Sequence, residues 1–383
     1  MINFLYLFTL ILTILKPYLE NYDILIENWE LSLLYSFLFI FGIDNMIKNK
    51  VRFSFYLIIP TIFIILHPIL ILTIPDKNYL FNNISKFSGF IIIFSFIRPY
   101  IDNFKNKNIT IIVVSAVIIL VLGIIKTLQF QDFDLLQRFG EYEGNFYSQS
   151  TITLHAGFLL LFSYISYYFS NKNLYIFLII LSLIIIYLAF SKTQIISVFI
   201  TFLIIFKILN KKKKRVSKTI NNVFIICIIL LVLSYFSKRL NYIYNTENFD
   251  TLTGRTFIWS STLAEILLKP FLGHGFNSII RIYTTIAKIE INNTHNFLLN
   301  FLYQVGFIGT IIFLTSFIKA SINIYKRVNY KKDKFDLIIF SYLCIIFING
   351  FGLSSFSEVS SLAYYIFIIA LINEFTEVSN DKY

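Results

Sequence analysis

Long apolar runs alternate with short polar segments along most of the chain. The runs contain about 16 to 22 residues, and a representative one extends from Ile109 to Leu128. A helix of about 20 apolar residues crosses the roughly 30 Å hydrocarbon core of a bilayer. The pattern therefore predicts an all-α, polytopic membrane helix bundle with about twelve transmembrane helices. Their expected ranges are 2–18, 29–43, 53–74, 80–99, 109–128, 151–169, 174–190, 193–209, 222–237, 297–318, 337–352 and 358–374.

The positions of lysine and arginine predict how these helices are oriented. Two segments are strongly basic, Lys207 to Lys218 and Lys319 to Lys334, and two expected helices separate them. If both segments are cytoplasmic, the inner side holds 21 of the 33 basic residues and seven of the 21 acidic ones. The inner side then carries +14 and the outer side −2, as the positive-inside rule requires. We therefore expect both termini in the cytoplasm.

The composition agrees with a membrane protein and narrows the partners. Hydrophobic residues make up 57% of the 383 positions and charged residues 14%, whereas a soluble domain has about a quarter charged residues. The basic residues behind the net charge of +12 are concentrated on the expected cytoplasmic side of the membrane. We therefore expect a lipid bilayer as partner and no nucleic acid. Cys227 and Cys344 lie within apolar runs without metal-ligand spacing, which is typical of small core residues.

Two expected outer loops are longer than simple turns. We interpret residues 1–383 as a single integral membrane domain, with a first outer loop at 129–150 and a large outer loop at 237–296 between the ninth and tenth helices. Long loops in compact proteins tend to carry function, so the large loop is the expected catalytic segment. No internal repeat typical of a two-fold symmetric transporter is present.

The large loop has its own helix pattern. Thr253 and Gly254 form a helix entry, and the stretch from Thr256 to Leu268 has helical periodicity. Pro270 and Gly273 end this helix, and the Gly-His-Gly sequence that follows predicts a tight turn.

Two residues of the large loop are candidates for direct chemistry. Arg255 stands at the expected helix start, where backbone N–H groups and the helix dipole favour an anion, and a guanidinium binds phosphate with two parallel hydrogen bonds. Its alternative is a surface arginine or a lipid-headgroup contact. His295 precedes an apolar helix at the membrane boundary, where an imidazole can accept a proton from a sugar hydroxyl. Its alternative is an interfacial histidine without a catalytic role.

Further residues are weaker candidates for binding. Lys192 lies at the outer boundary between two apolar runs, where an ionisable side chain is either functional or snorkels to the surface. Arg138 in the first outer loop adds another cation for a diphosphate. His274, between two glycines, is either a structural turn residue or a substrate contact. Arg281 and Tyr283 share the large loop and are candidate cavity residues.

Two other histidines are expected to be structural. His67 beside Pro68 and His155 within an apolar run are interpreted as packing or interhelical hydrogen-bonding residues. The sequence contains no Walker A motif, dinucleotide fingerprint, HExxH or carboxylate-rich metal motif. We therefore expect a reaction without metal or cofactor, in which cations stabilise the departing diphosphate.

In their order and spacing these residues resemble the O-antigen ligase and O-antigen polymerase superfamily, the Wzy/WaaL type of membrane glycosyltransferase. The matching pieces are Ser191-Lys192-Thr193, Thr253-Gly254-Arg255 with Trp259, Lys269 to Gly275, His295-Asn296, and Gly306 with Gly309. The resemblance covers about 120 residues, from Phe190 to Gly309. The family commonly has arginine where Lys192 stands, and lysine keeps the charge without the bidentate geometry.

The resemblance implies an inverting transfer on the periplasmic face of the bacterial inner membrane. The donor is a glycan linked to undecaprenyl diphosphate, His295 is the general base and Arg255 holds the diphosphate. The acceptor is another lipid-linked repeat unit in a polymerase, which we favour, or lipid A core in a ligase. Transfer to protein or teichoic-type acceptors is a third option. A chain-length regulator is a further partner of such a polymerase.

A flippase or transporter for a lipid-linked oligosaccharide is an alternative of another class. Such a protein would use outer cations only to bind the diphosphate. Transporters tend to have internal symmetry and polar residues at the membrane midplane, whereas the ionisable residues here gather at the outer face. The feature that discriminates is whether Lys192, Arg255 and His295 converge in one outward-facing cavity.

Overall fold

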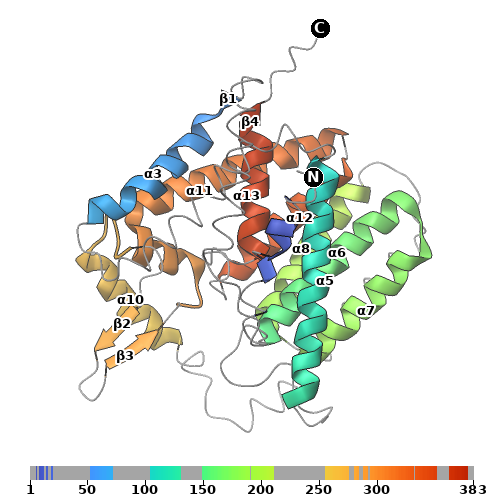
Figure 1. The fold of residues 1–383 in the computed structure, drawn as a ribbon, viewed down its shortest axis with the longest axis horizontal. Coiled ribbons are helices and arrows are strands. Elements are labelled where there is room, and N and C mark those ends of the chain that lie inside the picture. Colours follow the sequence, from blue (N-terminus) through green and yellow to red (C-terminus); the bar gives the residue numbers. More distant parts are fainter. Residues whose placement is uncertain are drawn as a thin grey trace. The chain divides into compact units, whose positions relative to one another are not determined.

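The computed structural model has two compact units, and the residues that it describes in them are mostly helical (Figure 1). The described residues are part of 6–19, then 52–71, 104–130, 149–189, 191–210, 255–275, 280–283, 288–291, 294–331, 333–351 and 362–377. Unit 1 comprises residues 1–112, 257–326 and 350–383, and unit 2 comprises residues 113–256 and 327–349.

Helices occupy the expected positions wherever the chain is described. They are α3 (Phe55–Ile71), α5 (Phe104–Phe130), α6 (Gln149–Ser170), α7 (Asn173–Ala189), α8 (Lys192–Asn210), α10 (Arg255–Leu268), α11 (Phe297–Lys331), α12 (Lys334–Gly350) and α13 (Leu362–Phe375). The helices expected at 29–43, 80–99 and 222–237 lie outside the described residues, as does part of the first.

Several of these helices have the length and composition of membrane spans. Within the described residues, Lys105–Ile125, Thr151–Ser170 and Phe297–Tyr330 are long and apolar enough to cross a bilayer. Asn173–Ala189 and Thr193–Leu209 are shorter apolar helices. The prediction of a helical membrane protein is therefore confirmed, while the number of twelve spans stays a prediction.

In unit 2, α6 packs against α7 and α8 and also contacts α12. A Cβ atom on Gly157 of α6 would lie 2.5 Å from Val198 Cγ2 of α8, so the missing side chain lets these helices approach closely. The ring of the buried Tyr342 of α12 contacts that of Phe158 in a tilted arrangement, with centroids 4.7 Å apart, and its hydroxyl donates to the Phe158 carbonyl at 3.1 Å. His155 is buried and its Nδ1 lies 2.7 Å from the Thr151 carbonyl, so its expected packing role is confirmed.

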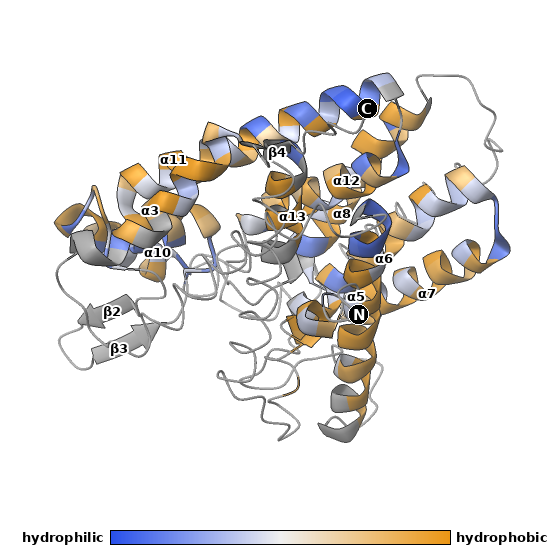
Figure 2. Cartoon of the chain, turned by 45° about the horizontal axis from the view of Figure 1, so that its top comes forward, coloured by the Kyte–Doolittle hydropathy of each residue, from blue (hydrophilic) through white to orange (hydrophobic). Residues whose placement is uncertain are grey.

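The basic segment from Lys319 to Lys334 was expected to be a loop, and this was wrong for most of its length. Helix α11 continues to Lys331 because no glycine or proline interrupts residues 319–331 and lysine and arginine are good helix formers. Residues 307–331 of α11 alone extend roughly 37 Å, beyond the roughly 30 Å hydrocarbon core. Hydrophobic residues prevail in the part of α11 near α3, and hydrophilic ones gather toward its other end (Figure 2).

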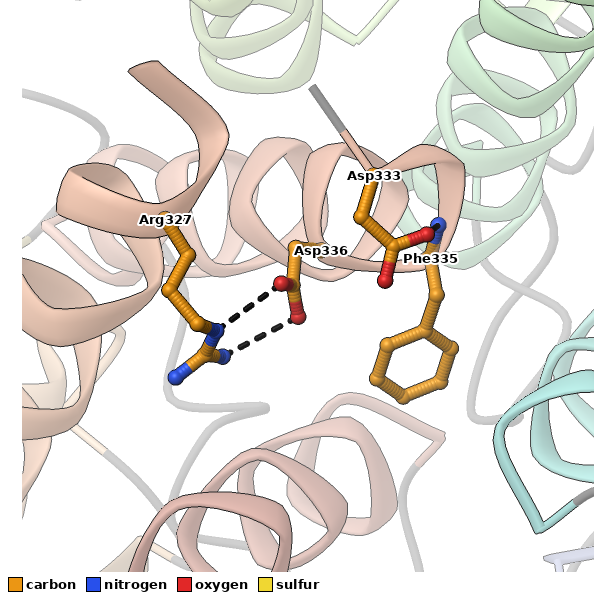
Figure 3. A network of polar contacts seen from close by, with 4 residues as sticks. All are labelled: Arg327, Asp333, Phe335 and Asp336. Carbon is orange, nitrogen blue, oxygen red and sulfur yellow. Dashed lines mark hydrogen bonds and ion pairs between the residues drawn. The ribbon is translucent and has the colours of Figure 1, made fainter. Parts of the chain in front are cut away.

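A two-pronged ion pair joins the end of α11 to the start of α12. Arg327 donates from Nε to Asp336 Oδ2 at 2.9 Å and from Nη2 to Asp336 Oδ1 at 3.0 Å (Figure 3). Asp336 is buried, so the bidentate geometry compensates for the desolvation of its charge. Asp333 accepts from the Phe335 N–H at 3.3 Å and caps the start of α12.

Two small antiparallel sheets accompany the helices. Strand β1 (Arg52–Phe53) pairs with β4 (Thr376–Glu377), and β2 (Ile280–Tyr283) pairs with β3 (Lys288–Ile291). The all-α prediction describes the helical bundle correctly, but it missed the β2–β3 pair in the large loop. Isoleucines alternate with Arg281 and Tyr283 in β2 and with Lys288 and Glu290 in β3, which is the period-two pattern of a strand.

Candidate active site

Helix α10 presents Arg255 at its first position. The helix covers Arg255–Leu268, as the periodicity of the large loop predicts. Arg255 is half-buried, and this burial lowers the pKa of its guanidinium, which nevertheless stays charged at neutral pH. A cation beside the free N–H groups of a helix start is suited to bind a phosphate oxygen.

A strained turn carries His295 immediately before α11. His295 has a φ of 53°, a left-handed conformation that costs a residue with a Cβ of order 1–2 kcal/mol. Asn296 compensates by capping α11, because its Oδ1 accepts from the N–H of Leu298 at 3.0 Å and of Leu299 at 3.3 Å. The Thr294 hydroxyl, which is buried, donates to the Asn296 carbonyl at 2.6 Å. The sequence around His295 is therefore organised to hold one backbone shape.

Trp259 ties this turn to α10. Its indole Nε1 donates to the Thr294 carbonyl at 2.9 Å. Trp259 follows Arg255 by one helical turn, so the two residues share a face of α10. Further along the helix, buried Ile266 packs against Tyr303 in the first turns of α11. The part of α10 from residue 257 onward is thus fixed to the turn that carries His295.

Helix α11 is broken at Gly306, and the segment after α10 completes the break. Gly306 has φ 65° and ψ −171°, which interrupts the helical hydrogen bonds around it. The carbonyls of Tyr303 and Gln304 accept instead from the N–H groups of His274 and Gly275, both at 2.8 Å. The N–H groups of Phe307 and Ile308 donate to the carbonyls of Pro270 and Phe271, at 2.8 and 3.2 Å respectively. Four hydrogen bonds therefore dock residues 270–275, which we call the clamp, onto the broken helix.

Glycines allow the backbones of the clamp and α11 to meet. A Cβ on Gly273 would lie 2.6 Å from the Gln304 carbonyl group, and one on Gly306 would overlap the backbone of Phe271 and Leu272. From α3, buried His67 donates from Nε2 to the Leu272 carbonyl at 2.7 Å. His67 is therefore a buried packing residue, as expected, but its hydrogen bond goes to the clamp and not to another helix.

The contacts of His274 favour the structural alternative for this residue. Its ring stacks on Tyr303 with centroids 4.4 Å apart and planes inclined by 16°. Its Nε2 donates to the Glu265 carbonyl of α10 at 2.9 Å. His274 thus joins α10, the clamp and α11, and contact with substrate stays a prediction.

Replacing Gly306 by alanine is expected to unfold this part of the protein. The methyl group would meet backbone atoms that cannot move aside, and the φ and ψ values of Gly306 are accessible almost only to glycine. We expect the melting temperature of the detergent-purified protein to fall by several degrees.

Gly309→Ala is the matched control for this substitution. Gly309 lies in the same helix without a positive φ, and the nearest atoms to its Cβ would be those of the Phe63 ring and the Val305 side chain, at about 2.6 Å, and not backbone atoms. A smaller loss is therefore expected. Equal melting temperatures for Gly306→Ala and the unmodified protein would contradict the proposed need for glycine.

The other candidate residues are placed only in part. Lys192, the first residue of α8, and Arg255 belong to unit 2, whereas His295 belongs to unit 1. On the β2–β3 pair, Arg281 is in register with Glu290 and Tyr283 with Lys288. Arg138 lies outside the described residues. The convergence of Lys192, Arg255 and His295 in one cavity stays a prediction.

Three contributors to the site were not anticipated as such. They are the indole of Trp259, the hydroxyl of Thr294 and the amide of Asn296. Asn296 stands immediately before an apolar helix, which is a recognisable capping signal. Among the described residues, no three His, Cys, Asp or Glu side chains come together in a way that could bind a metal ion.

The helices and the polar turn at the start of α11 define a helical membrane protein with a structured polar segment outside its apolar helices. Residues 177–314 match the family model described as O-antigen ligase. This match confirms the resemblance to the O-antigen ligase and polymerase superfamily, whose members are glycosyltransferase-like enzymes of bacterial membranes. A comparison with curated proteins gave no match.

The matched segment contains most of the candidate site. Its members among the predicted residues are Lys192, Arg255, His274, Arg281, Tyr283 and His295. It also includes the clamp and Gly306, whereas Arg138 precedes it. The match supports the shared ligase and polymerase type of function without separating the two, and it gives no support to a flippase.

Proposed function

We propose that this protein joins undecaprenyl-diphosphate-linked glycans on the outer face of the bacterial inner membrane, as a repeat-unit polymerase of a surface polysaccharide. The observation that supports this most is the fixed arrangement of α10, which begins with Arg255, and the left-handed turn that carries His295. Both lie within the segment that matches the O-antigen ligase family.

The proposed reaction needs one cation and one base. Arg255, helped by the N-terminus of α10, binds the diphosphate of the donor and stabilises the negative charge that develops as it leaves. His295 accepts the proton of the acceptor hydroxyl. The hydroxyl oxygen bonds to the anomeric carbon from the face opposite the diphosphate, the bond between this carbon and the phosphate oxygen breaks, and the configuration inverts.

The remaining candidates are assigned to binding. Lys192, Arg138 and Arg281 would add positive charge for the diphosphate, and Tyr283 and His274 would line the glycan path. A metal ion is not required by this scheme, because the cations take over the stabilisation of the leaving group.

A deletion of the gene tests the function. If lipid A core then carries a single repeat unit while long chains vanish, the protein is a polymerase. If full-length polymer accumulates on undecaprenyl diphosphate beside bare core, it is the ligase, which is the second candidate because the matching family model carries that description. Wild-type patterns of both lipopolysaccharide and lipid-linked glycans would contradict the proposed function.

Lys192→Arg is expected to keep polymer formation within about two-fold of the unmodified protein, because the charge is retained and a bidentate geometry is gained. Lys192→Gln is expected to reduce polymer formation at least about ten-fold, because the loss of one charged hydrogen bond to the donor corresponds to about 1.5–3 kcal/mol. Polysaccharide gels of the complemented deletion strain measure both. An inactive Lys192→Arg variant would show that the site requires lysine specifically.

A further inference from the structure

Two lysines and two aromatic rings meet at one end of unit 2. Lys334 Nζ lies 5.6 Å from the ring centroid of Phe162 and 5.8 Å from that of Tyr175. The two rings contact each other edge to face at 6.1 Å. Lys172 lies in the turn between α6 and α7, and its carbonyl accepts from the N–H of Tyr175 at 3.0 Å, so its backbone adjoins the residue whose ring Lys334 contacts. Burial and, after it, the positive charge of Lys172 lower the pKa of the Lys334 ammonium. We call Lys172, Lys334, Phe162 and Tyr175 the lysine cluster.

The nearest carboxylates in sequence are already engaged. Asp333 caps α12 by accepting from the Phe335 N–H, and Asp336 accepts both hydrogen bonds from Arg327. Among the described residues, no ion pair joins a carboxylate to Lys334 or Lys172. The cluster therefore holds two positive charges that are not paired with a carboxylate among the described residues, and one anion placed between them would offset part of this charge.

The cluster stands where a lipid-facing stripe ends. Helix α7 is apolar and exposes a row of large side chains at helical spacing, namely Leu174, Phe177, Ile180, Leu181 and Ile184. Leu174 is 63% exposed and follows Lys172 by two residues. Phe169, at the end of α6, is also exposed. A cation at the end of such a stripe lies at the level of lipid headgroups, with aromatic rings at the same interface.

We propose that the lysine cluster binds the phosphate of an anionic phospholipid headgroup. The phosphate bridges Lys172 and Lys334 and removes their mutual repulsion, while the acyl chains follow the exposed stripe of α7. The rings of Phe162 and Tyr175 hold Lys334 in place through cation–π contacts. This site belongs to unit 2 and is independent of the proposed glycan chemistry.

Native mass spectrometry of the full-length protein in detergent tests the site. Phosphatidylglycerol and phosphatidylcholine with the same acyl chains are titrated separately, and inorganic phosphate is added as a competitor. We expect tighter binding of phosphatidylglycerol, weakened about 25-fold in Lys172→Gln/Lys334→Gln, since each lysine contributes about five-fold. Lys172→Arg/Lys334→Arg keeps the charges and is expected to bind as the unmodified protein does.

The matched control is Lys207→Gln/Lys326→Gln. Lys207 and Lys326 are exposed and lie in segments predicted to be cytoplasmic. Their replacement by glutamine removes the same amount of charge as the replacement of Lys172 and Lys334. Unchanged binding in this control is expected. An equal loss of phosphatidylglycerol binding in the two double glutamine variants would show non-specific electrostatic attraction and would overturn the site. Wild-type binding of phosphatidylglycerol by Lys172→Gln/Lys334→Gln would also overturn it. Displacement of phosphatidylglycerol by an equal concentration of inorganic phosphate would overturn the lipid as the source of the phosphate.

Discussion

Replacement of His295 is expected to stop glycan transfer while donor binding persists. Removal of a general base slows a reaction by about 100- to 10,000-fold. The preferred variant is His295→Asn, because asparagine tolerates the left-handed conformation that His295 adopts and cannot act as this base. The measurement compares turnover with donor affinity in the purified protein, using a lipid-linked repeat unit as substrate.

A second variant separates chemistry from backbone strain. His295→Ala also lacks the imidazole, and it places alanine in the left-handed region, so it is expected to lower the melting temperature as well. Equal turnover losses in both variants, with a normal melting temperature for His295→Asn alone, would support the assignment of the base. Undiminished turnover in His295→Asn would remove His295 from this role.

Replacement of Arg255 by alanine is expected to abolish polymer formation without affecting membrane insertion. The guanidinium of Arg255 is proposed to bind the diphosphate both in the bound donor and as the diphosphate leaves. Loss of this guanidinium is therefore expected to lower kcat/KM for the donor at least about 100-fold. Arg255→Lys keeps the charge and loses the two-pronged geometry, and is expected to recover only part of the activity.

Ser260→Ala is the matched control on the same helix. The Ser260 side chain is exposed, and its hydroxyl donates only to the Phe257 carbonyl one turn earlier, at 3.0 Å. Its activity and abundance in the membrane are expected to match those of the unmodified protein. Normal chain lengths from Arg255→Ala would eliminate the diphosphate assignment.

Local signals in the sequence predicted local structure well. The periodicity of Thr256 to Leu268 located α10, and Pro270 with Gly273 located its end, because capping and chain-breaking residues act within a few positions. The extension of α11 to Lys331 was missed because the basic segment that begins at Lys319 was interpreted as a loop. Lysine and arginine are good helix formers and can continue a helix outside the membrane.

The contacts that form the site depend on residues far apart in the chain. Trp259 bonds to Thr294, and His67 bonds to Leu272, which lies 205 positions later. Neither pairing leaves a periodic or compositional trace in a single sequence. The glycines at 273 and 306 were visible as motif members, but their shared purpose, a close approach of two backbones, appears only when both segments are placed.

The break at Gly306 also affects how the membrane acts on the site. Residues 297–305 of α11 are connected to α10 through Tyr303 and to the clamp through hydrogen bonds, whereas the helix continues from Phe307 to Lys331 on the other side of the break. A continuous helix would transmit every change of tilt to its end. Because α11 is interrupted at Gly306, we expect the position of His295 to depend on the contacts of residues 297–305 with α10 and the clamp, and less on the tilt of the helix after the break.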